Sequence, residues 1–378
     1  MSLASMLGLD TRHAGECTVR IGGSDFSEFY PNLQTTVINL GRRDSSEATL
    51  TFSMLRDGDG RWPLAEDPRL RTWAQVEVLV VFGDSEEPFF SGYVRAIETA
   101  IPEQGTVATV TCKCQDIFAA MDRHCRRVTW EEGRDSLDII RQIIAPYGLT
   151  LETDLASTRV DNRHQNKTDY RFIRELAEEN QYEWYLRDRQ GGVRVLYYGP
   201  PRASAEATGK LMIHAGRQTN CLEFSVSYDG YQPDRVRVST APLTGSEIEQ
   251  TSSVPQLPLF GTRGADSGDR GLDDFEWCLP PGDGNNQEAG EARAQGQAEE
   301  RSFKLQARGR LDGTAYGMLL LPGSVVEVGG TGDNNGKWYV DRTTHTFDAT
   351  GYFVDFELVR NAAAGDETSS DHILSGVI

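Results

Sequence analysis

The stretch LPGSVVEVGGTGDNNGKWYVDRTTHTFDATGYFVDFELVR, residues 321–360, decides the fold that this sequence predicts. Val326-Glu327-Val328 and the run around Tyr339-Val340 alternate hydrophobic and polar residues, as strands with one buried face do. The Gly- and Asn-rich residues between them are typical of a hairpin loop and lead into no helix, so a phosphate-binding loop is not expected. Gly351, twelve residues after Tyr339, lies near the turn of a second hairpin. We therefore predict strands over 324–328, 337–347 and 352–359.

The same order of features occurs in the first third of the chain. Val76-Glu77-Val78 is followed by Tyr93-Val94 and then, twelve residues after Tyr93, by Gly105. Hairpins in general share such features, but the matching order and spacing favour an internal duplication with two similar β units. Three chains around an axis would present six such units. That assembly would have true three-fold and approximate six-fold symmetry, and it could join a three-fold partner to a six-fold one.

Periodicity changes in the middle of the chain. Asp135 can cap a helix that carries Leu137, Ile140 and Ile144, and a second helix begins at Thr168 or Asp169. Residues 241–287 are rich in Gly, Pro, Ser and Asp and predict a long surface loop, whereas the alanine-rich residues 288–308 predict a helix packed closely against a sheet. The remaining predicted strands are 18–21, 34–40, 48–54, 76–82, 89–101, 106–114, 182–187, 193–198, 221–228 and 234–239.

The predicted fold class is α+β, mainly β, with two tandem β barrels and a small α+β module between them. A chain of 378 residues has room for several domains. The predicted boundaries are 1–116 for the first barrel, 117–202 for the module, 203–361 for the second barrel with loop 241–287 and helix 288–308, and 362–378 for a C-terminal tail.

Charge and hydrophobicity exclude some classes of protein. The formal net charge of −19 opposes binding to nucleic acid, because phosphates require Lys and Arg to replace their counterions. No hydrophobic run has the length of a membrane-spanning helix, so we expect no membrane insertion. Residues 1–16 have neither a basic start nor a long hydrophobic stretch, and we expect assembly in the bacterial cytoplasm and not secretion.

No catalytic, cofactor or metal site is predicted. Cys112 and Cys114 lie on one side of a predicted strand, and His124-Cys125 supplies no second pair at the spacing of a zinc site, so buried free thiols are favoured. The sequence contains no HExxH, GxSxG or P-loop motif. His345 lies in a strand without a local partner for general base catalysis, and we expect it to pack or donate a hydrogen bond.

Two segments resemble a known family. The string Pro322-Gly323, Gly336, Tyr339-Val340, His345, Gly351-Tyr352 and Leu358-Val359-Arg360 is similar to the C-terminal signature of the phage late control protein D family. Residues 169–184 resemble the central helix and hairpin of that family. The family includes the hubs of contractile phage tails and R-type tailocins, and the N-terminal part of type VI secretion spike proteins (VgrG) is similar. The residues that carry the signature are Pro322, Gly323, Gly336, Tyr339, His345, Gly351, Tyr352 and Arg360.

This resemblance implies a structural function. It implies a homotrimer that serves as the baseplate hub of a contractile injection system and joins a six-fold tail tube protein to a three-fold spike. The chain ends soon after the second predicted barrel, which implies a separate spike protein and further baseplate components as partners. The resemblance does not say whether the particle is a phage tail, a tailocin or a type VI relative, nor whether acidic residues line its channel.

Two other functions stay open at this point. A tail-associated enzyme that degrades peptidoglycan would require two carboxylates across a sugar cleft. A receptor- or glycan-binding tail module would require exposed aromatic residues on loops, and Trp62, Trp73 and Trp277 are the candidates. Separately, a polar linker precedes a hydrophobic end, which is typical of a docking peptide. The residues predicted to dock a partner are Ile373, Leu374, Val377 and Ile378.

Overall fold

The computed structural model describes residues 15–364 except 84, 104–106, 132–133, 156–158, 161–162, 190–191, 241–248, 267, 269–270 and 281–286. The fold is mainly β, as predicted, and a 13-stranded sheet dominates it. No helix among the described residues combines the length and hydrophobicity of a membrane span. Gly105 and the predicted docking residues Ile373, Leu374, Val377 and Ile378 lie outside the described residues.

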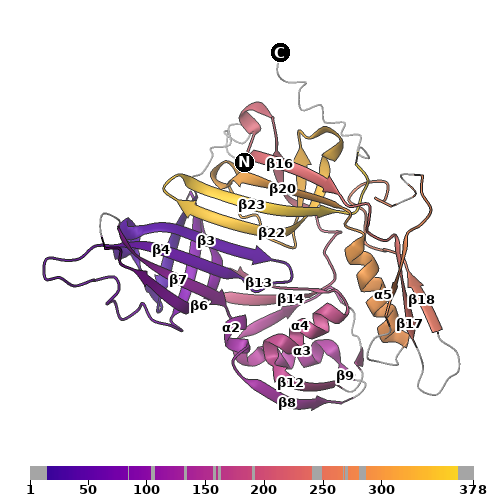
Figure 1. Cartoon of the computed structure of the whole chain (residues 1–378), viewed down its shortest axis with the longest axis horizontal. Helices are drawn as coiled ribbons and strands as arrows, with labels where there is room; N and C mark the ends of the chain where they lie inside the picture. The colour runs from indigo at the N-terminus through magenta and orange to yellow at the C-terminus, as the bar shows by residue number, and fades with distance from the viewer. Residues whose placement is uncertain are drawn as a thin grey trace.

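The first part of the large sheet comes from the N-terminal third of the chain, drawn in indigo in Figure 1. Its strands alternate buried and exposed residues; in β4, for example, Ala48, Leu50, Phe52 and Met54 point into the core. The elements are β1 (Gly15–Ile21), β2 (Ser24–Asp25), a 3-10 helix (Ser27–Asn32), β3 (Leu33–Gly41), β4 (Glu47–Met54), β5 (Gln75–Phe82), β6 (Ser85–Ala100) and β7 (Ala108–Asp116).

The second part of the large sheet comes from the C-terminal half. Strand β23, for example, buries Tyr352, Val354, Phe356 and Leu358 on one side. The elements are β15 (Ala207–Met212), a 3-10 helix (Gly216–Gln218), β16 (Cys221–Tyr228), β20 (Leu305–Asp312), α6 (Gly313–Tyr316), β21 (Val325–Gly329), a 3-10 helix (Gly332–Asn334), β22 (Gly336–Asp348) and β23 (Gly351–Arg360).

The predicted helix-and-hairpin module is present and has its own hydrophobic core. The Asp135 side chain accepts a hydrogen bond from the Leu137 backbone amide, and Thr168 caps the second helix in the same way through Arg171, so both predicted caps are confirmed. The elements are α2 (Phe118–Met121), β8 (Cys125–Trp130), β9 (Arg134–Asp135), α3 (Ser136–Ile144), a 3-10 helix (Ala145–Tyr147), β10 (Leu149–Glu152), β11 (Arg159–Val160), β12 (Arg163–Thr168), α4 (Asp169–Glu179), β13 (Glu183–Arg189) and β14 (Val193–Gly199).

An insertion between β16 and β20 departs from the prediction. The predicted loop 241–287 contains β18 (Glu249–Ser253) and β19 (Glu276–Leu279), which flank β17 (Arg235–Thr240) in a separate three-stranded sheet. Strand β18 reads EQTSS, so it lacks the hydrophobic alternation that would reveal a strand. The predicted helix 288–308 is also too long. Helix α5 (Gln287–Arg301) ends where the Ser302 hydroxyl donates to the Glu299 carbonyl, and β20 begins at Leu305.

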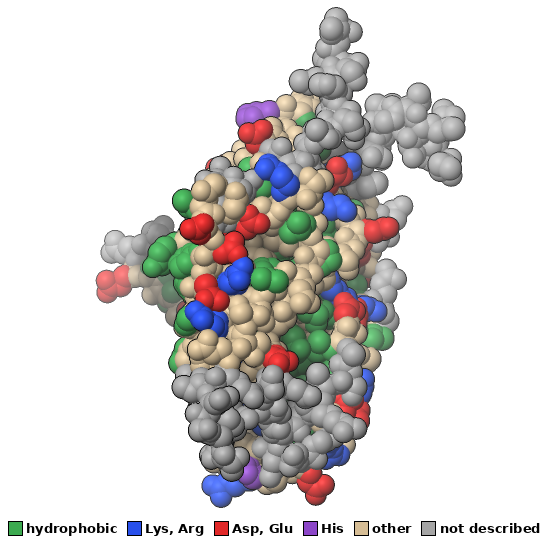
Figure 2. Space-filling model, turned by 90° about the vertical axis from the view of Figure 1, so that its right-hand side faces the viewer, with side chains coloured by type: hydrophobic (Ala, Val, Ile, Leu, Met, Phe, Trp, Pro, Cys, Tyr) green, Lys and Arg blue, Asp and Glu red, His purple; other side chains and the backbone are tan. Residues whose placement is uncertain are grey.

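Helix α5 does pack closely, as its small residues predict. Ala294 and Ala298 are buried, and at Gly296 an added Cβ atom would lie 2.1 Å from the Asn180 carbonyl oxygen. Figure 2 shows the side of the molecule that lies to the right in Figure 1, where α5 and β18 are found. Acidic, basic and hydrophobic side chains are interspersed there. The excess of acidic residues therefore forms no single patch on this side.

The two parts of the large sheet repeat one another in register. Tyr93 lies opposite Gln75, and Tyr339 lies opposite Val325. Each tyrosine is followed by a paired valine and then by one extra residue, Arg95 in β6 and Asp341 in β22, that forms a β-bulge. The duplication predicted from the sequence is therefore present in the sheet.

A second bulge extends this equivalence. Gln34 is the extra residue in β3 against β4, and Leu222 is the extra residue in β16 against β20. In both cases the bulge lies four residues before the residue that faces the alanine of the next strand, Ile38 opposite Ala48 and Val226 opposite Ala307. Strands β3, β4, β5, β6 and β7 thus correspond to β16, β20, β21, β22 and β23, in the same chain order.

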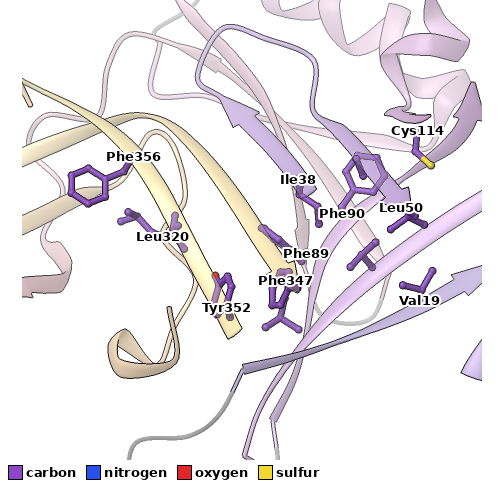
Figure 3. Close-up of a cluster of buried hydrophobic side chains, with 14 of the residues drawn as sticks. Val19, Ile38, Leu50, Phe89, Phe90, Cys114, Leu320, Phe347, Tyr352 and Phe356 are labelled. Atoms are coloured by element: carbon purple, nitrogen blue, oxygen red, sulfur yellow. The ribbon is translucent and has the colours of Figure 1, made fainter. Parts of the chain in front are cut away.

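The two halves join edge to edge. Strand β22 pairs antiparallel with β3, from Arg342 opposite Gly41 to Asp348 opposite Thr35, so the strands run without a break from one half into the other (Figure 1). One hydrophobic core underlies both halves, and Figure 3 shows Ile38 and Leu50 of the first half near Phe347 and Tyr352 of the second. Among the described strands the hydrogen-bonded path stays open, and neither half closes into a barrel.

Candidate functional site

The face of the large sheet opposite the core is polar in both halves. On the first half it carries Thr49 and Lys113, and on the second it carries Arg308 and Glu357. Charged residues on it are paired across neighbouring strands: Lys113 with Glu98, Arg308 with Glu357 at 3.2 Å, and Arg310 with Asp355 at 3.8 Å. The charges thus largely offset one another, and acidic residues do not dominate this face.

A shallow hollow lies on this face over β16, β20, β23 and β22. Its lining includes Glu223, Arg308, Arg342, Asp355 and Glu357. Two of its carboxylates are bound by arginines of an adjacent strand, as described above. These two carboxylates are thus engaged in ion pairs on the polar face.

A buried ionic cluster lies where the two halves meet the module and the insertion. Arg42, at the end of β3, donates to Glu183 of β13 at 3.0 Å and to Glu300 of α5 at 2.9 Å, and it also pairs with the bulge residue Asp341. The Tyr339 hydroxyl donates to the second Glu183 oxygen at 2.7 Å. We call Arg42, Glu183, Glu300, Tyr339 and Asp341 the joint cluster. It ties four distant segments of the chain together.

Neighbouring carboxylates keep the Arg42 guanidinium charged. Although burial alone lowers the pKa of Arg42, the carboxylates of Glu300, Asp341 and Glu183 hold it well above its ordinary value. Burial raises the pKa of Glu183, and Arg42 opposes that rise. The rings of Phe303 and Tyr339 stack 6.1 Å apart beside the guanidinium, which lies 5.5 Å from the Phe303 centroid. A network of this kind fixes relative orientation, because loss of one partner leaves a buried charge unpaired.

His345 is buried in the core and bonded on both ring nitrogens. One nitrogen lies 2.7 Å from the Tyr352 hydroxyl, and the other lies 3.0 Å from the Leu320 carbonyl oxygen and 3.1 Å from the Thr343 hydroxyl. Burial lowers the pKa of His345 to about 3, so the ring is neutral at physiological pH. Phe89 packs against it at 4.6 Å. These contacts are those of a packing histidine.

The other signature residues shape the second half of the sheet. The Pro322 carbonyl accepts from Arg187 at 2.7 Å, and a Cβ atom added at Gly323 would lie 2.4 Å from the Tyr185 hydroxyl oxygen. Arg360 is fully buried, donates to the Asn335 carbonyl at 2.7 Å and lies over the Trp338 ring at 5.7 Å. Gly336 and Gly351 adopt φ of 114° and 135° at the two ends of the β22 hairpins.

The structure therefore brings only some signature residues together. His345 and Tyr352 form one pair, and Tyr339 belongs to the joint cluster, whereas the others lie apart along β21 to β23. The sequence offered no sign of Arg42, Glu183, Glu300 or Asp341 as partners, since charged residues at strand and helix ends are ordinarily solvated. Only their burial in the fold identifies them.

The remaining candidate residues lie apart from these clusters. Arg123 lies over the Trp73 ring at 4.3 Å and Arg301 over the Trp277 ring at 4.8 Å, although Trp73 stays 39% exposed, and Trp62 packs partly against the core. Burial raises the pKa of the Cys112 thiol to about 12 and raises that of Cys114 as well. Within the described part of the chain, no group of His, Cys, Asp and Glu is arranged to hold a metal ion.

Comparisons with known proteins agree with one another. The family model for the phage tail baseplate hub (GPD) matches residues 64–351. The 43 kDa tail protein of prophage MuSo2 from Shewanella oneidensis is 13% identical and superposes with a TM-score of 0.68 over 92% of this chain and 98% of that one. A tail protein from Neisseria meningitidis MC58 is 12% identical and superposes with a TM-score of 0.65 over 93% of this chain and 98% of that one.

A type VI secretion protein shares the fold as well. The Escherichia coli c3393 protein, a component of that system, is 10% identical with a TM-score of 0.54, over 89% of this chain and 77% of that one. No curated protein matches the sequence. At such identities the similarity to solved structures concerns the fold, and the match to the family model carries the assignment.

Proposed function

Because the chain belongs to the phage tail baseplate hub (GPD) family, we propose that it is the trimeric adaptor between a six-fold tail tube and a three-fold spike. Family and fold make it a structural component of a phage tail or a related particle. The proposal adds the homotrimer, two tandem β units formed by the two halves in place of the predicted closed barrels, the tube and spike proteins as partners with other baseplate components, and assembly in the bacterial cytoplasm.

The repeated register of the two halves carries this proposal. Both halves have the same strand order and the same two bulges, so a trimer presents six closely similar surfaces. A six-fold tube binds six similar surfaces, whereas a three-fold spike binds three identical ones. A trimer of one chain with two equivalent halves therefore presents six similar surfaces to the tube and three identical surfaces to the spike.

The polar sheet face supports a channel in this assembly. Both halves carry hydroxyl, amide and paired charged groups on this face, and their hydrophobic residues lie beneath it. A surface with balanced charges attracts neither nucleic acid nor acidic protein strongly. In the proposed trimer this face lines the lumen.

The work of this chain is structural and not enzymatic in our proposal. His345 is buried and neutral, and carboxylates of the polar face are paired with arginines. Incubation of the purified protein with peptidoglycan tests this directly. Release of soluble sugar fragments above the level of a heat-denatured sample would contradict it.

Native mass spectrometry of the full chain, alone and with the tail tube protein of the same particle, tests the adaptor. We expect a trimer and a complex of one trimer with six tube subunits. A monomer at all concentrations would contradict the adaptor. Deletion of residues 366–378 tests the predicted docking segment, and we expect weaker binding to tube or spike with the trimer intact.

A further inference from the structure

Two open strand edges of the large sheet belong to strands whose counterparts are paired with one another inside the chain. Strand β16 is the last strand of the hydrogen-bonded path at one end (Figure 1), whereas β1 and β2 form the other end. Within the path, β6 pairs with β5 only up to Tyr93, and no described strand pairs with the same side of residues 96–100. Open edges are templates for pairing with another chain.

We propose that β16 of one copy pairs antiparallel with residues 96–100 of β6 in a second copy, with Ser227 opposite Glu98. This inference rests on the trimer proposed above and specifies how its subunits join. The pairing is head to tail, because the two edges are different surfaces of one chain, and such contacts generate rings when the rotation closes.

The junction inside the chain supplies the template for this register. There β3 pairs with the corresponding second part of β22, and Asn39 lies opposite Thr344 with their side chains 2.8 Å apart. Strand β16 corresponds to β3, and Ser227 is the counterpart of Asn39, because 226 − 38 = 188 and 227 − 39 = 188. Glu98 is the counterpart of Thr344, because 340 − 94 = 246 and 344 − 98 = 246. These two open edges are thus the counterparts of the two edges that are joined inside the chain.

Exposed hydrophobic side chains mark these edges. Ile101 is 59% exposed, whereas its counterpart Phe347 in the paired strand is 8% exposed. In the proposed register Ile101 lies opposite Phe224, as Phe347 lies opposite Thr36 in the template. Leu222 and Tyr228, at the two ends of β16, are 55% and 37% exposed. Pairing would shield Ile101 in the way that the internal junction shields Phe347.

Charge at the bulges distinguishes the two junctions. Inside the chain the bulge residue Asp341 is acidic and binds the basic Arg42 just beyond the end of β3. On the open edge the bulge residue is the basic Arg95, and the acidic Asp229 lies next to Gly230, the counterpart of Arg42. Each pair is complementary with the signs reversed. Pairing between the β3 edge of one chain and the β6 edge of another is therefore unfavourable, because the like charges of Arg42 and Arg95 would face each other.

The open edges lack the usual protection against pairing. Strand β16 has eight residues without Lys or Pro, and residues 96–100 of β6 have none either. Monomeric proteins commonly shield edges with such residues or with a covering segment. These two edges, free of Lys and Pro, are therefore compatible with strand pairing between copies.

Cross-linking of paired cysteines tests the register in the full chain. Glu98→Cys with Ser227→Cys, in a background with the exposed Cys125 and Cys278 changed to Ser, places two thiols opposite one another across the contact. We expect mild oxidation to give a covalent trimer on a denaturing gel. Glu98→Cys with Val226→Cys is the matched control, and it should remain largely uncross-linked because adjacent residues face opposite sides of a strand.

The outcomes separate this inference from the proposed function. A trimer by native mass that gives no cross-link, or that cross-links equally in the control, overturns the strand pairing and leaves the adaptor standing. A monomer at every concentration overturns both. Charge reversal gives an independent test. Arg95→Glu and Asp229→Arg should each raise about tenfold the protein concentration at which half of the trimer has dissociated. The double variant should return this concentration to the value of the unchanged protein. Lack of restoration would contradict the proposed contact.

Discussion

The two halves of the large sheet differ most in the connection between their first two strands. In the first half β3 leads to β4 through residues 42–46, whereas in the second half residues 229–304 separate β16 from β20 and contain β17, β18, β19 and α5. Both bulges and all pairings are nevertheless kept. Strand pairing and bulges therefore fix the register of each half, because the entropic cost of closing a longer connection grows only slowly with its length.

The insertion in one half is bonded to the short connection of the other. Glu300 of α5 contacts both Arg42 and Arg43, which follow β3 directly. The long connection thus reaches across the junction of the two halves and completes the joint cluster.

The joint cluster should matter most. Arg42→Ala leaves Glu183 buried without its cation, and we expect the free energy of unfolding to fall by about 3–5 kcal/mol. The control is Arg141→Ala, which removes an exposed pair with Asp138 and should cost less than about 1 kcal/mol. Urea denaturation followed by tryptophan fluorescence measures both. Equal effects would show that the cluster does not hold the halves together.

Gly323 and Trp73 occupy equivalent backbone positions and should respond differently. Their amides donate to the carbonyls of Val340 and Val94, and both have positive φ, 73° and 68°. Gly323→Ala places a Cβ atom against Tyr185, so we expect a loss of about 2–3 kcal/mol. Trp73→Gly relieves a left-handed backbone but loses ring contacts with Tyr93 and Arg123, so its net effect should be about 1 kcal/mol or less. Thermal denaturation compares the two.

Acid should weaken the second half through His345. Its pKa is lowered to about 3 in the fold, so the unfolded chain binds the proton more readily and stability falls as pH drops below the ordinary value near 6.5. At pH 5 the loss due to this residue is about 2 kcal/mol. His345→Gln should remove that part of the pH dependence. Its counterpart in the first half, Thr99, has no such group, and Thr99→Val serves as the control.

The polar faces of the two halves should be alike and weakly stabilising. Lys113→Ala in the first half and Arg308→Ala in the second each remove one exposed ion pair, and each should change the free energy of unfolding by less than about 1 kcal/mol. A loss of several kcal/mol in only one half would show that the two faces are not equivalent. Chemical denaturation of both variants in parallel decides this.

The sequence predicted the duplication in the strands whose equivalent residues differ in number by a nearly constant amount between the two halves. Val76 and Val326 differ by 250, Tyr93 and Tyr339 by 246, and the residues paired with Val94 and Val340, Cys114 and Leu358, by 244. For the first two strands the offsets are 188 and 259, because the insertion lies between them. Their equivalence could not be found by spacing and emerges only from the hydrogen-bonded register.

The predicted helix caps and most strands were found from local signals, since a cap or an alternating run depends on neighbouring residues. The insertion sheet was missed because β18 is polar on both sides. The joint cluster was missed for a different reason. Its members come from residues 42, 183, 300, 339 and 341, and nothing in the sequence near any one of them indicates the others.

The junction between β3 and β22 has a consequence for synthesis of the chain. Asn39 and Thr344 are 305 residues apart, so the edge of β3 leaves the ribosome long before the strand that covers it. At about 5–20 residues per second, that edge stays unpaired for roughly 15 to 60 s. Within one polysome, several nascent chains expose the same β3 edge together with finished β6 edges. The like charges of Arg42 and Arg95 then act as a safeguard during translation, before any finished hub exists.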